Sequence, residues 1–310
     1  MSYKTVLPTF ILLLGLLVFT TPSTAQQVAD TLFKPNVGAP AFKEGTGPTV
    51  VVDEAHHNFH TMEGRYLAFA RLLQKDGYVV KPQRGRFIRS DLDRAKILVI
   101  SNALAKENVD DWNLPTPSAF DSAEIESVRN WVKDGGSLWL IADHLPFPGA
   151  AGPLAAEFGI LMGNGFALDA RTEEGRMRFI RADGSLTDHP ITRGRNSSER
   201  VDSVIAFTGQ AFRLEGIGDP LMTLRRDVVL LMPEVAWQFS KLTPRISASG
   251  MLQGAVISFG KGRVAAFGEA AMFSAQVSGP NRAPAGMNDP TAPQNAQFLL
   301  NVIHWLSGLL

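Results

Sequence analysis

Strands that lack a polar face are the feature that most constrains the fold of this chain. Three continuous apolar runs, at 49–52, 95–100 and 137–141, show no alternation of polar and apolar residues, which indicates strands buried on both faces. Residues 62–76 and 121–134 lie between these runs and carry apolar side chains at helical spacing, and a glycine follows each segment. Strands that alternate with helices form βαβ crossovers. The sequence therefore predicts an α/β fold with a doubly wound, mainly parallel sheet.

The C-terminal half of the chain shows a different pattern. Residues 160–250 contain short strand-like pieces separated by turns, which predict either an antiparallel extension of the sheet or an inserted subdomain. Residues 255–259 and 263–267 flank Gly260-Lys261-Gly262 and predict a hairpin with a glycine-rich turn. A final helix is expected from Pro293 to Leu306.

The N-terminus has the composition of a secretory signal. Lys4 precedes an apolar run from Phe10 to Phe19, and small residues at the −3 and −1 positions predict cleavage after Ala25. A membrane anchor is the alternative, but the run is shorter than the roughly 20 residues that a spanning helix needs. We expect a signal peptide at 1–25, a loosely ordered arm at 26–47 and one α/β domain at 48–310. The mature protein is then periplasmic or secreted, with no membrane span.

Charge and cysteine content exclude some classes of function. Lys plus Arg equals Asp plus Glu at 30 each, so there is no electrostatic case for nucleic-acid binding. The chain contains no cysteine, which excludes a thiol nucleophile and thiolate metal ligands.

Polar residues capable of chemistry follow three of the expected strands directly. The first strand leads into the segment from Asp53 to His60, the strand at 137–141 leads into Asp143-His144, and the strand at 263–267 leads into Glu269. In an open parallel sheet, ligands bind in the crevice beyond the carboxyl ends of the strands. The sequence therefore predicts one shared site at this edge.

Two kinds of chemistry are compatible with such a site. A divalent cation such as Zn, Mn or Fe could be held by imidazole and carboxylate ligands, and metal-free acid–base catalysis by a carboxyl–histidine pair is the alternative. The expected metal ligands are Asp53, Glu54, His56, His57 and His60. The expected catalytic residues are His144, Asp143 and Glu269, and the expected substrate-binding residues are Asn58, Phe59, Phe147 and Gly149.

Structural roles compete with these assignments. Asp53 could hold a turn, and Glu269 could cap the short helix expected near Ala270. Gly149 lies at an expected helix start, where free backbone N–H groups could bind an anion. For His189, which precedes a proline, and His304, in the last helix, a structural role is expected.

Four segments resemble the class I glutamine amidotransferase-like superfamily, which has a flavodoxin-like sheet. They are Gly135–Ile141, Asp188–Gly194, Gly260–Val264 and Asn295–Trp305, and they look most similar to an uncharacterised exported branch related to trehalose-utilisation-type and gliding-motility-associated domains. Amidotransferases of this superfamily place a nucleophilic cysteine after the strand that corresponds to 137–141, where this chain has Asp143-His144. The resemblance therefore implies the fold but not glutamine hydrolysis.

Two functional hypotheses follow from the sequence. The first is an exported hydrolase, possible with or without a metal, that acts on a small or saccharide-like substrate. The second is a non-catalytic module of the same fold that binds a carbohydrate or a peptide.

Overall fold

Five parallel strands form the centre of the structure, a computed structural model that describes residues 27–310. The predicted signal peptide lies outside the described residues. The strands run in the order β3 (Val79–Gln83), β2 (Thr49–Asp53), β4 (Ile97–Ser101), β5 (Ser137–Ile141) and β15 (Gly262–Phe267). Numbered along the chain, this order is 2-1-3-4-5, which is the flavodoxin-like order, so the expected doubly wound, mainly parallel α/β fold is confirmed.

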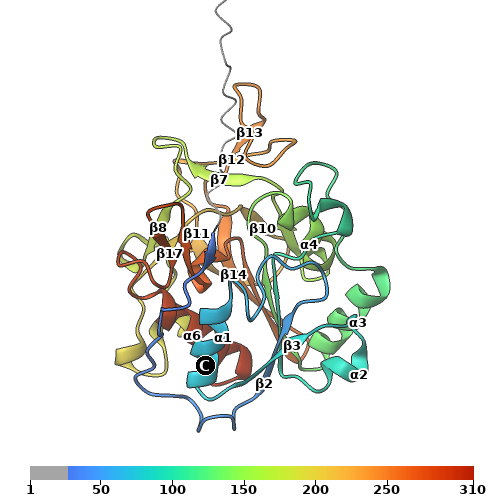
Figure 1. Ribbon diagram of the computed structural model, residues 1–310, viewed down its shortest axis with the longest axis vertical. Coiled ribbons are helices and arrows are strands. Elements are labelled where there is room, and N and C mark those ends of the chain that lie inside the picture. Colours follow the sequence, from blue (N-terminus) through green and yellow to red (C-terminus); the bar gives the residue numbers. More distant parts are fainter. Residues whose placement is uncertain (1–26) are drawn as a thin grey trace, which may run out of the picture.

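The antiparallel extension is also confirmed. The hairpin partner of β15 is β14 (Leu252–Phe259), and the sheet continues through β10 (Phe212–Leu214) to β6 (Ile160–Met162), with β11 (Asp219–Thr223) also paired to β14. Other parts of the 160–250 region leave the main sheet. They form a three-stranded sheet of β7 (Phe166–Asp169), β12 (Val228–Leu231) and β13 (Arg245–Ser247), and a pair of β8 (Met177–Ile180) with β9 (Ser203–Ala206). Figure 1 shows the three-stranded sheet at the end of the molecule towards which the parallel strands point.

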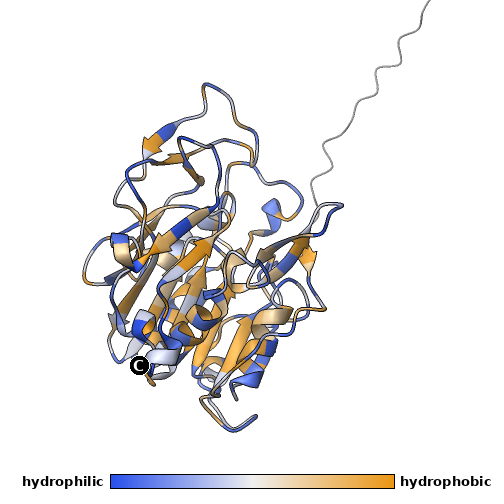
Figure 2. Ribbon diagram, turned by 90° about the vertical axis from the view of Figure 1, so that its left-hand side faces the viewer, coloured by the Kyte–Doolittle hydropathy of each residue, from blue (hydrophilic) through white to orange (hydrophobic). Residues whose placement is uncertain are grey.

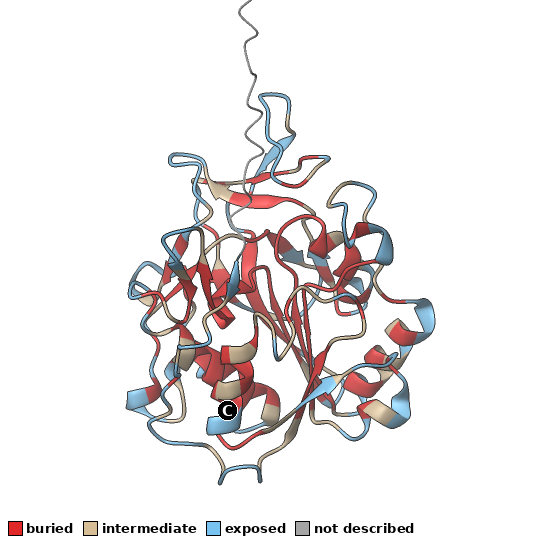
Figure 3. Cartoon of the chain, in the orientation of Figure 1, coloured by how far each residue is buried: buried red, intermediate tan, exposed pale blue. Residues whose placement is uncertain are grey.

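Helices cover both faces of the sheet (Figure 1). Alternate strand residues such as Val50, Val52 and Trp139 pack with α1 (Leu67–Lys75) and α6 (Asn295–Ser307). The residues between them, such as Val51 and Leu98, pack on the other face with α3 (Ser122–Lys133) and α4 (Phe147–Ala156), with α2 (Arg89–Leu92) beside α3. Strands β2, β4 and β5 are therefore buried on both sides, which explains their continuous apolar sequences, whereas the edge strand β3 is partly exposed and carries Lys81 and Gln83. Figures 2 and 3 show apolar, buried strands at the centre of the sheet, with exposed polar residues on α2 and α3, whereas α6 is almost wholly buried.

Local signals explain most of the helix boundaries. Asp121 caps α3 by accepting the Glu124 N–H, and the Glu124 side chain accepts the Asp121 N–H in return, a capping box. Helix α1 begins five residues later than expected, because residues 62–66 form turns in which the N–H groups of Gly64 and Tyr66 both donate to Thr61 O. Helix α4 begins at Phe147, before the helix start expected around Gly149, with Pro148 in the first turn, where no N–H is needed.

The remaining elements are short. The arm at 26–47 contains β1 (Val28–Ala29), which pairs with β16 (Ala275–Ser278), and β16 pairs with β17 (Ala283–Gly286). Helix α5 (Pro190–Arg193) begins at His189, whose Nδ1 accepts the Ile191 N–H. Short 3-10 helices lie at Lys106–Asn108, Arg181–Asp183, Ser197–Glu199 and Ala271–Phe273. No helix within residues 27–310 has both the length and the apolar composition to cross a membrane.

Candidate functional site

A cavity of about 780 Å³, here called the strand-edge pocket, lies at the carboxyl ends of the parallel strands. Residues from the loops that follow four of the strands line it. They are Phe59 and His60 after β2, Asn102 after β4, Asp143 and His144 after β5, and Ala271 after β15. The pocket therefore spans the switch point between β2 and β4, where this fold is expected to bind ligands. Other parts of the chain complete the lining with Gln27, Arg65, Trp112, Phe147, Phe207, Thr208, Trp237 and Gln276.

His144 is held in one orientation at the wall of this pocket. Its Nδ1–H donates to the carbonyl of Leu145 at 2.8 Å, so Nε2 carries the lone pair. The ring stacks on Phe166 with centroids 4.4 Å apart and meets the edge of Trp237 at 4.6 Å. Burial lowers the pKa of His144, although the neighbouring Asp143 opposes the shift. Nε2 has no hydrogen-bond partner among residues 27–310, and burial favours the neutral ring, in which Nε2 is a free acceptor.

The pKa of the neighbouring carboxyl group, Asp143, shifts in the opposite direction. Burial raises the pKa of Asp143, although the charge of His144 and hydrogen bonds from its N–H, from Asn102 and from Thr208 act against the shift. Asp143 Oδ1 accepts the His144 N–H at 3.1 Å and the Thr208 hydroxyl at 3.5 Å. The two predicted catalytic residues on this loop thus both line the pocket, His144 with a lowered pKa and Asp143 with a raised pKa.

Glu269 lies behind the wall of the pocket rather than on it. It is fully buried, and its carboxyl oxygens accept the N–H groups of Ala271 at 2.8 Å and Met272 at 2.7 Å. The competing structural role, a cap on the short helix at 271–273, is therefore present. Burial, followed by the charge of Asp143, raises the pKa of Glu269 well above its ordinary value.

His60 reaches the same pocket from the loop after β2. Asn102 Oδ1 accepts the Asp143 N–H at 2.8 Å, which orients its amide, and Nδ2 donates to His60 Nδ1 at 3.3 Å. The proton of the neutral ring is then on Nε2, which is buried and has no partner among the described residues. Burial lowers the pKa of His60 to about 3, and the nearby Arg65 contributes to the shift.

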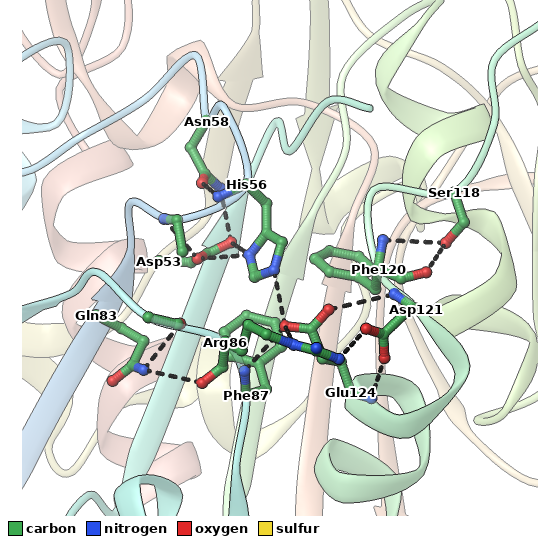
Figure 4. Close-up of polar contacts among 12 residues, drawn as sticks. Asp53, His56, Asn58, Gln83, Arg86, Phe87, Ser118, Phe120, Asp121 and Glu124 are labelled. Carbon is green, nitrogen blue, oxygen red and sulfur yellow. Dashed lines mark hydrogen bonds and ion pairs between the residues drawn. The ribbon is translucent and has the colours of Figure 1, made fainter. Parts of the chain in front are cut away.

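Asp53, His56 and Glu124 form a separate cluster, here called the closed triad, on the α3 side of the sheet (Figure 4). His56 Nδ1 lies 2.9 Å and 3.0 Å from the two oxygens of Asp53, and Nε2 lies 3.1 Å from Glu124 Oε1. Burial opposes the charged ring, but the hydrogen bonds and charges of the two carboxylates outweigh it and raise the pKa of His56. Both ring nitrogens are occupied, and none of the three residues lines the pocket.

The other residues predicted at the site lie outside the pocket or on its edge. Glu54 accepts the Met62 N–H and pairs with Arg84, and His57 is exposed. Asn58 donates to Asp53 and to the carbonyl of Ser101. The N–H of Gly149 is taken by Asn164 Oδ1, so the expected free helix start is occupied. Of the predicted substrate-binding residues, Phe59 and Phe147 line the pocket.

The five residues expected to hold a metal are not gathered into one centre. Asp53 and His56 are in the closed triad, His60 is in the pocket, and Glu54 and His57 are in neither. No group of three or more His, Asp or Glu side chains in the described part of the chain is arranged to hold a metal ion. His304 and Asp76 are both fully buried, with Nε2 of His304 2.6 Å from Asp76 Oδ2, and His304 Nδ1 has no partner among the described residues.

The sequence interpretation missed several lining residues. Asn102 directly follows β4, so the rule that found Asp143 and Glu269 would have found it if amides had been included with acids. Trp112, Thr208 and Trp237 come from loops distant in sequence, and no local pattern places them at the pocket.

Comparisons with known proteins show the fold only. No family model matches the chain, and no curated protein matches it. Among solved structures, the mmIFT52 N-terminal domain superposes with a TM-score of 0.58 at 12% identity, over 83% of this chain and 97% of that one. The cytoplasmic protein STM3548 from Salmonella typhimurium gives 0.50 at 13% identity, over 84% and 98% of the two chains. A thua-like protein from Bacteroides uniformis ATCC 8492 gives 0.47 at 11% identity, over 88% and 94%, a score that supports no further conclusion.

Proposed function

We propose that this protein is a hydrolase that acts on a small, hydroxyl-bearing substrate in the strand-edge pocket. The observation that carries the proposal is the pairing of Asp143 and His144, two adjacent residues that line one cavity with opposite protonation tendencies. An enzyme that hydrolyses a bond without a cofactor needs one group to take a proton from water and another to give a proton to the leaving group. Burial disfavours the charged form of both groups, which favours an imidazole that can accept a proton and a carboxyl group that can donate one.

The reaction that these groups support is direct attack by water. His144 Nε2 takes a proton from a water molecule, the water oxygen forms the new bond to the electrophilic carbon, and the bond to the leaving oxygen breaks. The Asp143 carboxyl protonates that oxygen. Within the described residues no Ser or Thr hydroxyl is hydrogen-bonded to His144, so the geometry favours water over a side-chain nucleophile.

The lining of the pocket supports a saccharide-like substrate. Phe59, Trp112, Phe147 and Trp237 offer flat apolar surfaces that fit the C–H faces of a sugar ring. Asn102, Thr208 and Gln276 lie among them and supply hydrogen bonds to hydroxyl groups. The same aromatic and polar lining would also serve the second candidate, a carbohydrate-binding module that is not catalytic, because sugar binding alone needs no acid–base pair.

The experiment is a hydrolysis panel of 4-nitrophenyl glycosides, 4-nitrophenyl esters and 4-nitroanilides. Wild type should hydrolyse at least one class, and His144→Ala should lose about 10²–10⁴-fold of that rate. His57→Asn is the matched control, because His57 is exposed, lies outside the pocket and has a φ of 48° that Asn tolerates. Full activity of His144→Ala would overturn the mechanism. Ligand binding without turnover of any class would favour the binding module.

Family, cofactor and compartment belong to the same proposal. The strand order and the position of Asp143-His144 after β5 support a place in the amidotransferase-like superfamily, in a branch without the cysteine. The N-terminal sequence supports export to the periplasm or the medium. A divalent metal carries no step here, and elemental analysis of untagged protein tests whether Zn, Mn or Fe is bound.

A further inference from the structure

An arginine without a carboxylate partner lies at the same pocket as the proposed catalytic pair. The Arg65 guanidinium packs 3.6 Å from the centroid of the Phe59 ring, and Nη1 donates to the Phe59 carbonyl at 3.2 Å. Among residues 27–310, no Asp or Glu oxygen lies within ion-pairing distance of it, and Nε is buried without a hydrogen-bond partner. Burial lowers the pKa of Arg65. The contact with Phe59 accounts for the flat face of the guanidinium and leaves its Nε–H edge unused.

A second unused donor lies beside it. His60 is 2% exposed, and its Nε2–H has no partner, because Asn102 occupies Nδ1 and fixes the proton on the other nitrogen. A buried N–H without a partner costs free energy, and Arg65 and His60 both line the pocket, where a bound acceptor would satisfy their N–H groups.

We propose that Arg65 and His60 form a subsite for a carboxylate, so that the substrate of the proposed hydrolase is a sugar acid. One fixed positive charge matches the single charge of a carboxylate, and the two donors match its two oxygens. A doubly charged phosphate would leave one charge unbalanced beside the Phe59 ring, and burying an unpaired charge is costly. Gln276 Oε1, which is also buried without a partner, is an acceptor and would receive a hydroxyl of the same sugar. That the sugar acid is a substrate rests on the proposed function, whereas the carboxylate subsite itself concerns binding only.

The test compares acid and neutral members of matched probe pairs by calorimetry on the folded protein. The pairs are D-glucuronate with D-glucose, D-galacturonate with D-galactose, and benzoate with benzyl alcohol. In at least one pair the acid should bind about tenfold or more tightly than its neutral partner, as expected for hydrogen bonds to a charged group. Arg65→Gln should remove that preference while leaving the affinity for the neutral partner within about threefold of wild type, since a double-mutant comparison isolates the charge.

The matched control is Arg94→Gln, which makes the same change of charge at a side chain that is 80% exposed and outside the pocket. His60→Gln provides a second test that keeps Arg65, and unfolding curves of each variant show whether it is folded. The proposal is overturned if no acid binds more tightly than its neutral partner, or if the preference survives Arg65→Gln. Tighter binding of glucose 6-phosphate than of glucuronate would show a phosphate site instead. If the protein prefers the acid but hydrolyses no substrate, the carboxylate subsite is supported and the hydrolase is rejected. If it hydrolyses a substrate but shows no preference for the acid, the hydrolase is supported and the subsite is rejected.

Discussion

The closed triad and the strand-edge pocket are two histidine–carboxyl clusters built partly from the same eight residues, 53–60. In the triad, both nitrogens of His56 contact carboxylates, so every strong donor is used inside the protein. In the pocket, His60 and Arg65 each keep a buried donor without a partner, and His144 keeps a free Nε2. The two clusters contain similar residues, but they differ in how many of their buried polar groups have hydrogen-bond partners. Because unused buried polar groups are rare in folded proteins, the pocket has the character of a ligand site and the triad that of a structural joint.

The triad joins strand β2 to helix α3. Glu124 also accepts the Phe87 N–H and the Asp121 N–H, so one carboxylate connects the helix cap, the loop before α2 and the end of β2. The wall of the pocket has a network of its own, in which Asn102 links His60 to Asp143 and Asp143 accepts the Thr208 hydroxyl, but this network leaves His60 Nε2 without a partner in the described part of the chain. The comparison predicts that changes in the triad act on stability, and that changes in the pocket act on ligands.

Removal of His56 should have the largest effect on stability. His56→Ala leaves Asp53 and Glu124 buried and near each other without the group between them, which should cost about 3–5 kcal/mol of unfolding free energy. Urea denaturation measures this, with the neighbouring exposed residue as control, since His57→Asn should stay within about 0.5 kcal/mol of wild type.

A second variant keeps this prediction decidable if His56→Ala does not fold. Adding Asp53→Asn and Glu124→Gln to His56→Ala removes the buried charges, so the triple variant should be more stable than the single one. Equal stability of His56→Ala and wild type would show that the triad does not stabilise the fold.

The two clusters should also respond to pH in opposite directions. The raised pKa of His56 means that its contribution is fully present below the unfolded value of about 6.5 and is lost as the pH rises through its folded pKa. The pKa of His60, about 3, means that its contribution is present above about 6.5 and is lost as the pH falls towards 3. Each effect has a slope of at most about 1.4 kcal/mol per pH unit.

Unfolding free energies between about pH 5 and 9 would separate the two slopes. His56→Gln should flatten the alkaline side of the stability profile, and His60→Gln should flatten the acidic side. If either variant flattened the opposite side, the assignment of open and closed clusters would be reversed.

The sequence predicted the parallel core well because burial on both faces leaves a direct signature. Strand β5 was predicted with its observed bounds, and β2 ends one residue later than predicted. Strand β4 begins two residues later and ends one residue later than predicted. Residues 160–250 were harder, because their partners are distant: β12 pairs with β7, about 60 residues earlier, and β10 pairs with both β6 and β14. Local propensity does not encode such pairings.

For the site, the rule that polar residues after parallel strands converge pointed to Asp143 and His144, and both line the pocket. The same rule could not say to which side each loop turns after the strand ends. Asp53 and His56 turn towards α3, whereas His60, four residues after His56, reaches the pocket. That division depends on Glu124, which is 68 residues from His56 in sequence, and no local pattern contains it.

Replacement of Trp237, a pocket residue, should have the smallest effect on stability, which tests the contrast between the pocket and the closed triad. It is 51% exposed, contacts the His144 ring and has a φ of 67°, a left-handed conformation that a bulky residue adopts at a cost of order 1–3 kcal/mol. In Trp237→Gly, relief of this strain offsets the loss of contacts, so the unfolding free energy should stay within about 1 kcal/mol of wild type. In Trp237→Ala the strain remains, and the protein should be the less stable of the two.

Ligand binding should distinguish the same variants in the other direction. Both Trp237→Gly and Trp237→Ala remove an aromatic wall of the pocket, so both should weaken the binding of D-glucuronate by about tenfold, the scale of one lost aromatic contact. A tryptophan that only packed the loop at 233–244 would show the reverse pattern, a loss of stability with unchanged affinity. Strain retained at an exposed tryptophan that contacts His144 is then best explained by a ligand that binds against its ring.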